Sequence, residues 1–264
     1  MTNYINEEIL CEAYTKLDID LFHDKEKLKL LEKSLKDFFE ERAKFYLGND
    51  AKIKIEFEEG SLITKLTVIG GAVTAIASGI AQYGSFRDSV AQIAEDATML
   101  AQSANSEVIF RTRTQYCNRL DSERRKGIFG RADDLIKRLD SIHDRIANSK
   151  LPTSLNALKA FNSANDDLAK WDLTADKFFN KLTDGPTIAC LSAGLLEELE
   201  KLPESVIWEN DLKKATFRST IANSNPKLAG EIAGAAARYA ATLNAIKRSN
   251  RTSLRNLFSQ SMLD

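Results

Sequence analysis

Seven basic residues are concentrated between residues 111 and 131, where only two residues are acidic. The aromatic residues Phe110, Tyr116 and Phe129 lie within or beside this stretch. Cationic side chains bind phosphates and aromatic rings stack on bases, so the combination could bind nucleic acid. Anionic lipid headgroups or an acidic protein surface are alternative ligands, and a solvated connection between helices is the favoured interpretation. The basic residues are Arg111, Arg113, Arg119, Arg124, Arg125, Lys126 and Arg131.

A second candidate for chemistry is the pair Arg138 and His143, which four residues separate on a predicted helix. This spacing resembles the RxxxxH motif of HEPN ribonucleases, an all-helical family that pairs two copies at a dimer interface. The resemblance implies that His143 takes part in acid–base chemistry on an RNA 2′-hydroxyl and that Arg138 helps to bind phosphate. The match covers six residues, and Leu139 stands where the family usually has a polar residue. The alternative is a solvated helix face.

The sequence lacks the usual motifs for metal, nucleotide or covalent chemistry. Two histidines are too few for a multi-histidine metal site, although each of them precedes an aspartate. No GxxxxGK[ST], HExxH, GxSxG or GxGxxG pattern occurs. The cysteines Cys11, Cys117 and Cys190 form no CxxC pair, which indicates reduced thiols. We therefore expect no metal and no cofactor, and we favour a non-enzymatic protein.

The longest uncharged stretch comprises twenty-one residues, Leu66 to Phe86, in a chain of which 28% of residues are charged. As a single helix it would be about 31 Å long, close to the hydrocarbon thickness of a bilayer. Lys65 and Arg87 flank it as interfacial anchors would. Its hydropathy is borderline for a membrane span, because it also contains glycine and hydroxyl residues.

Small residues recur at four-residue spacing in two parts of the chain. Gly71, Ala75 and Gly79 lie in the uncharged stretch, and Gly230 and Gly234 lie in a later predicted helix. Such strips allow two helices to approach closely, in a membrane or in a packed core. Packing of the two strips against each other in a soluble core is the favoured interpretation. Membrane contact and an oligomer interface are the alternatives.

The spacing of apolar residues predicts a mainly α protein, a multi-helix bundle with a short β-strand or hairpin near residues 51–68. Ile53, Ile55 and Phe57 alternate with charged residues, as in a strand with one solvated face. A strand needs a partner, so residues 62–68 are expected to pair back with it or, alternatively, to begin the apolar helix. Helices are expected at about 24–47, 85–116, 132–146, 154–182, 187–202 and 228–258, with 108–116 as an alternative strand.

Two of these helices have recognisable end signals. Asp24 is a suitable N-cap and Gly48 a suitable C-terminal glycine for the first helix. Ser85 and Asp88 resemble a capping box at the start of a second. We expect an N-terminal region of residues 1–150 and a C-terminal region of residues 151–264, with one continuous domain as the alternative.

Association with a second copy or with a protein partner is the function that the sequence favours. A net charge of −1 gives no overall attraction to nucleic acid or to anionic membranes. The first residues lack the pattern of a secretory signal, so a cytoplasmic location is expected, with membrane association as an alternative. A membrane-directed effector that uses Leu66–Phe86 is the most concrete version. A HEPN-like ribonuclease and a nucleic-acid-binding module are the alternatives.

Overall fold

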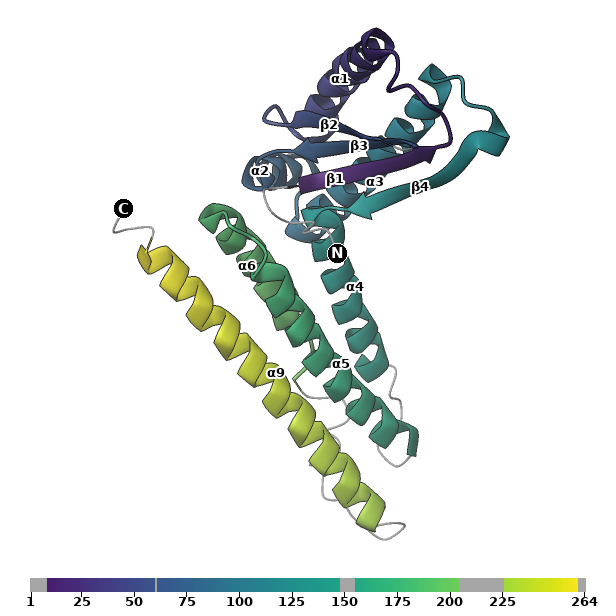
Figure 1. Cartoon of the computed structure of the whole chain (residues 1–264). Helices are drawn as coiled ribbons and strands as arrows, with labels where there is room; N and C mark the ends of the chain where they lie inside the picture. Colours follow the sequence, from purple (N-terminus) through teal and green to yellow (C-terminus); the bar gives the residue numbers. More distant parts are fainter. Residues whose placement is uncertain (1–8, 60, 148–154, 205–225, 261–264) are drawn as a thin grey trace. The chain divides into compact units, whose positions relative to one another are not determined.

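The computed structural model of the chain describes residues 9–59, 61–147, 155–204 and 226–260 (Figure 1). Within these residues it contains helices and a four-stranded antiparallel sheet, which confirms a mainly α protein with a small β element. The chain forms two compact units, residues 1–133 with 181–188 and residues 134–180 with 189–264. The expected division at residue 150 stays a prediction.

The sheet of the first unit has the strand order β2-β3-β1-β4. The β2–β3 hairpin confirms the expected pairing. The sequence did not predict the two other strands, and β3 has β1 as a second neighbour on its other side. The strands are β1 (Ile9–Leu17), β2 (Lys52–Glu58), β3 (Leu62–Ile69) and β4 (Arg119–Lys126), and the 3-10 helix η1 (Tyr116–Asn118) precedes β4.

The uncharged stretch is not one helix, so the single helix of about 31 Å that its length permitted is not formed. Its first residues, up to Ile69, belong to β3, and its middle forms the short helix α2 (Ala72–Tyr83). Phe86 begins the next helix, α3 (Phe86–Arg111). The first part is a strand because β3 is paired on both sides, and Leu66 and Val68 are buried there. In the described part of the chain, no helix combines the length and the hydropathy that a membrane span requires.

Helices α1 (Lys25–Leu47) and α3 contact the sheet and each other, and α2 packs on α3 (Figure 1). The buried residues of α1 recur every four positions, which gives the helix one apolar face. Its ends confirm the predicted signals. The Asp24 side chain accepts a hydrogen bond from the Lys27 backbone N–H at 3.1 Å, and Gly48 follows the helix with a φ of 106°. The buried residues are Leu31, Leu35, Phe39, Ala43 and Leu47.

Ser85 caps α3, as its sequence signal predicts, since its hydroxyl accepts a hydrogen bond from the Asp88 backbone N–H at 3.1 Å. We expect Ser85→Ala to lower the free energy of unfolding by about 1 kcal/mol, because an N–H at the helix start loses its acceptor. Urea unfolding measures this loss. Ser85→Gly is the matched control, with an expected loss of only a few tenths of a kcal/mol. A Ser85→Ala protein as stable as the parent would show that the hydroxyl contributes nothing.

The described secondary-structure elements of the second unit are all helices. Trp171 donates its indole N–H to the Leu135 carbonyl at 2.9 Å, which joins α5 to α4. The rings of Phe161 and Tyr239, 6.0 Å apart, join α5 to α9. These helices confirm the expected positions, apart from residue 154, which lies outside the described residues. They are α4 (Ile128–Ala147), α5 (Leu155–Phe179), α6 (Gly185–Glu200) and α9 (Pro226–Gln260), of which α4 and α6 begin within the first unit.

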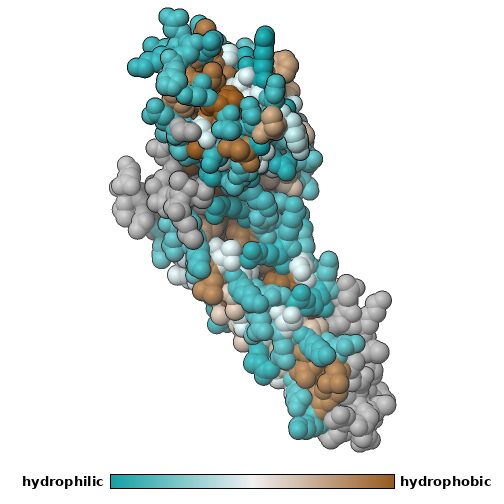
Figure 2. Space-filling model, turned by 45° about the vertical axis from the view of Figure 1, so that its right-hand side comes forward, coloured by the Kyte–Doolittle hydropathy of each residue, from teal (hydrophilic) through white to brown (hydrophobic). Residues whose placement is uncertain are grey.

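Figure 2 shows that hydrophilic residues occupy much of the face in view, with hydrophobic residues in separate patches between them. Two exposed apolar side chains lie at the start of β4. Tyr116 is 85% exposed and Leu120 is 52% exposed. Tyr116 precedes β4 and Leu120 lies within it. Because β4 carries four of the seven basic residues of the 111–131 segment, the two side chains add apolar surface to a charged edge of the sheet.

Candidate functional site

Strand β4 forms one edge of the sheet, and all but one of its side chains are exposed. Its inner side pairs with β1, with Lys126 opposite Cys11 and Arg124 opposite Ala13. The strand order places no other described strand on its outer side, so a row of backbone N–H and C=O groups faces outward there. Four of the seven basic residues lie on this strand: Arg119, Arg124, Arg125 and Lys126.

Polar side chains of α3 fix the position of β4. Asn105 is 7% exposed, and its amide donates to the Glu123 carbonyl at 2.9 Å. The Asn105 carbonyl oxygen accepts from the Thr15 hydroxyl of β1 at 2.7 Å. Arg124 donates to the side-chain oxygen of Gln102 at 2.9 Å. Pairing with β1 and hydrogen bonds from α3 therefore hold β4 in place, and no other described strand pairs with its outer side.

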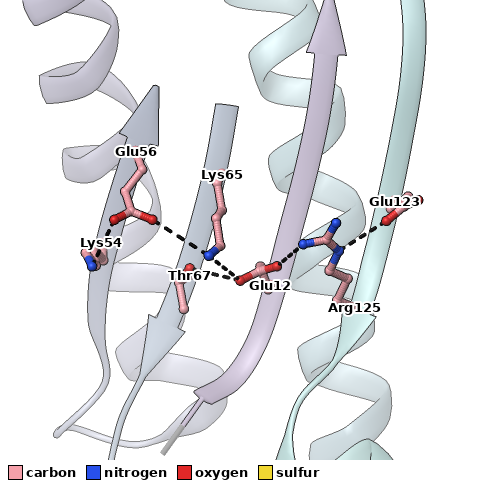
Figure 3. A network of polar contacts seen from close by, with 7 residues as sticks. All are labelled: Glu12, Lys54, Glu56, Lys65, Thr67, Glu123 and Arg125. Atoms are coloured by element: carbon pink, nitrogen blue, oxygen red, sulfur yellow. Dashed lines mark hydrogen bonds and ion pairs between the residues drawn. The ribbon is translucent and has the colours of Figure 1, made fainter. Parts of the chain in front are cut away.

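A charged row crosses the other face of the sheet, with Glu12 at its centre (Figure 3). Glu12 is 1% exposed, and its carboxylate accepts hydrogen bonds from Arg125 at 2.7 Å and from Thr67 at 3.4 Å. Lys65 lies 3.2 Å from the same carboxylate and 3.7 Å from Glu56 on β2. A buried carboxylate needs such compensation by opposite charges. Glu12 thus links β1 to both neighbouring strands and holds the Arg125 side chain of β4.

A pocket of about 150 Å³ lies between β4 and α3. Ala94, Ala97 and Ala101 line it from one face of α3, and Leu10 and Cys11 line it from β1. Residues spaced three and four apart share one face of a helix, and the methyl groups of the alanines leave room above that face. The floor of the pocket is therefore apolar. Its basic lining residues are Arg124, Arg125 and Lys126.

Cys11 is not a nucleophile in this setting. Its side chain is buried, and burial together with the neighbouring Glu12 carboxylate raises the pKa of its thiol to about 12. At neutral pH the thiol therefore stays protonated, whereas the reactive species of a cysteine is the thiolate. Cys11 contributes apolar surface to the pocket.

Gly127 joins β4 to α4 at the edge of the pocket. A Cβ atom built on Gly127 would overlap the backbone carbonyl of Leu10 and the carbonyl oxygen of Ile9. Only glycine allows this close approach of the two backbones. The residue therefore fixes the distance between the end of β4 and the beginning of β1.

The remaining basic residues lie outside β4. Arg111 ends α3 and pairs with Glu107 at 2.8 Å, and Arg131 lies in the first turn of α4. Arg113 is exposed in the segment between α3 and η1. The structure thus gathers four of the seven residues on one strand and distributes the others over neighbouring elements. A nucleic-acid-binding surface stays a prediction.

Arg138 and His143 are both exposed on α4 and have different neighbours. Arg138 donates to the Thr174 hydroxyl of α5 at 3.2 Å, and the His143 ring lies 3.4 Å from Asp144. Five helical residues rotate the direction of a side chain by about 140°, so the two point to different sides of the helix. The ribonuclease interpretation stays a prediction, and these contacts do not bring its two residues together.

The small residues of the first strip pack inside the first unit. A Cβ atom on Gly79 of α2 would lie 2.9 Å from the Ser89 Cβ atom of α3, and Ala75 is buried. Gly71 is the N-cap residue of α2. The second strip is more open. A Cβ atom on Gly230 would have no neighbour within 4 Å among the described residues, and one on Gly234 would meet only the Arg238 guanidinium, at 3.6 Å.

Within the described ranges, no group of three histidine, cysteine, aspartate or glutamate side chains could hold a metal ion. Comparisons of the chain with protein-family models, with curated proteins and with solved structures found no match. The geometry of β4 and its pocket is therefore the basis for a function.

Sequence reasoning missed Glu12 and the alanine pocket. The signal for Glu12 was a single glutamate within the largely apolar run ILCEAY, where a buried charge requires a partner. The alanines could be recognised as one face of a helix, but no local pattern indicated a concave site there. The pocket exists only because β4 lies beside that face.

Proposed function

We propose that this chain is a non-enzymatic binding protein whose first unit docks an extended segment of a partner protein onto β4. The observation that carries the proposal is the outer edge of β4, which pairs with no other described strand and lies beside an apolar pocket. Addition of a strand to a sheet edge is a common mode of peptide recognition, in which backbone hydrogen bonds supply affinity and pockets supply specificity. The outer edge of β4 has backbone groups for such hydrogen bonds, and the pocket lies beside it.

The charges of β4 favour a different protein over a second copy of this chain. In an antiparallel pairing, directly opposite residues share a face of the sheet. When β4 pairs with a second copy of itself, an even-numbered residue must therefore lie opposite an even-numbered one, and an odd-numbered residue opposite an odd-numbered one. The register centred on Ser122 places Arg119 opposite Arg125 and Asp121 opposite Glu123. The register centred on Glu123 places that carboxylate opposite itself. Like charges directly opposite each other are destabilising, so a partner with another charge pattern fits better.

A selection experiment tests the proposal with the full chain. Short random peptides displayed on phage are selected for binding, and the winners are synthesised. We expect them to slow amide hydrogen exchange in residues 119–126, because a new strand would cover the outward N–H groups of β4. The control is each peptide with alternate backbone amides N-methylated, which removes donors for strand pairing and should abolish binding. Protection elsewhere in the chain, or tight binding of the methylated peptides, would refute the proposal.

A further inference from the structure

The pocket beside β4 indicates what the docked segment contains, an inference that rests on the proposed function. We infer that β4 takes an extended acidic segment that carries one apolar side chain for the alanine pocket. The volume and lining of the pocket indicate the size and polarity of the side chain that would enter it. The basic residues around the pocket indicate that the flanking residues of the segment are acidic.

The size of the pocket suits one apolar side chain. Its volume is about 150 Å³, and Ala94, Ala97 and Ala101 form much of its floor with Leu10 and Cys11. An engineered apolar cavity of about 150 Å³ holds one benzene molecule. A leucine, isoleucine or phenylalanine side chain is of similar size, and burying one on an apolar floor is favourable.

The charge around the pocket is of one sign. Three of its lining residues are basic and none is acidic. Arg125 is paired with Glu12 on the far face of the sheet, so it contributes least to a ligand. Arg124 contacts the neutral amide of Gln102, which leaves its charge uncompensated by that contact. A segment that brings carboxylates to this rim therefore meets complementary charge.

The alternation of side chains in a strand turns these features into a sequence pattern. Arg124 and Lys126 lie two residues apart on β4 and both line the pocket, so they share one face of the strand. In a segment paired with β4, every second residue would face the same way. An apolar residue opposite Arg124 would enter the pocket. An acidic residue two positions to one side of it would lie opposite Lys126, and one two positions to the other side would lie diagonally across from Arg124, within reach of its long side chain. The expected pattern is acidic–x–apolar–x–acidic.

Fluorescence anisotropy with the full chain tests this pattern. The probe is a short labelled peptide with a central leucine, glutamates two positions to either side and threonine elsewhere. We expect it to bind about tenfold more tightly than the same peptide with lysines for the glutamates, since two rim ion pairs together supply an effect of that size. The preference should fall with added salt. The peptide with alanine for leucine should also bind more weakly.

Two protein variants locate the contact. Thr98 is exposed and lines the pocket, so Thr98→Trp should fill its mouth without disturbing the core and weaken binding of the leucine peptide about tenfold. Met99 is the next residue on α3 and is 51% exposed, but it does not line the pocket. Met99→Trp should therefore leave binding unchanged.

The outcomes separate this inference from the proposed function. If peptides protect the β4 amides regardless of their charge, or if Thr98→Trp has no effect, the acidic segment is wrong and strand docking stands. If the chain itself dimerises with protection of β4, the occupant is a second copy, and the inference is wrong. If neither the designed peptides nor any peptide from the random selection protects the β4 amides, both the inference and the proposed function are wrong.

Discussion

Replacing Gly127 with alanine is expected to destabilise the protein by about 3 kcal/mol or more, the largest loss we expect from any single methyl group in this chain. The added Cβ atom would overlap the carbonyl of Leu10, which is backbone and cannot rotate away. The end of β4 would have to move away from β1, and the hydrogen bonds between the two strands would weaken. Urea unfolding followed by circular dichroism measures the loss.

Gly230→Ala is the matched control for this substitution. Gly230 lies on α9, and a Cβ atom there would have no neighbour within 4 Å among the described residues. Alanine is the better helix former by up to about 1 kcal/mol, so this variant should gain stability. A Gly127→Ala protein as stable as the parent would show that β1 and the end of β4 do not approach each other as closely as the structure requires.

The Glu12→Gln variant is expected to lose about 3 kcal/mol of stability, because it removes the buried carboxylate of two ion pairs. Lys65 and Arg125 would keep only their more exposed partners, Glu56 and Glu123. Glu12 is 1% exposed, and the side chains of Lys65 and Arg125 are each 23% exposed. Glutamine keeps the shape of glutamate, so the loss reports on charge and not on packing. Thermal and urea unfolding of the two proteins at neutral pH measure it.

Glu56→Gln is the control on the same row of charges. Glu56 pairs with Lys54 at 2.9 Å, but its side chain is 41% exposed, and exposed ion pairs contribute less than about 1 kcal/mol. A double-mutant cycle of Glu12→Gln with Arg125→Gln should show coupling, since the two groups are 2.7 Å apart. Equal losses for Glu12→Gln and Glu56→Gln, without coupling to Arg125, would contradict a special role of the buried carboxylate.

The helices of this chain could be predicted from local signals. The cap at Asp24, the glycine at Gly48 and the cap at Ser85 all occur where the sequence placed them. These signals act over three or four residues, so the groups that form each cap are near neighbours in the sequence and can be recognised there. The hairpin partner of β2 could also be predicted, because β3 follows it after a short turn.

The other two strands could not be predicted, for opposite reasons. β1 is buried on most of its length, so it lacks the clear alternation of a strand with one solvated face. β4 is exposed on nearly all of its length, so it has no apolar periodicity and resembled a charged connection between helices. Its identity as a strand depends on β1, about one hundred residues earlier, and no local pattern reports such a pairing.

Strand pairing also determines the structure of the uncharged stretch. The stretch from Leu66 to Phe86 is as long as a membrane helix, and its composition alone permits one. Pairing of β3 with β1 and β2 divides it, and the remaining helix α2 has only 12 residues. The small-residue strip was informative at one position in particular, since Gly79 does mark a close approach between two helices, α2 and α3.

The late position of β4 in the chain has a consequence for synthesis on the ribosome. β1, β2 and β3 are all complete by residue 69, but β4 begins only at residue 119. Until then the nascent sheet would have β1 at its edge, a strand with the run ILCEAY, and apolar edges promote aggregation. The arrival of β4 replaces that edge with a highly charged one. The strand that we propose as the docking site for a partner would thus also cover the apolar edge through which the incomplete sheet could aggregate with other chains.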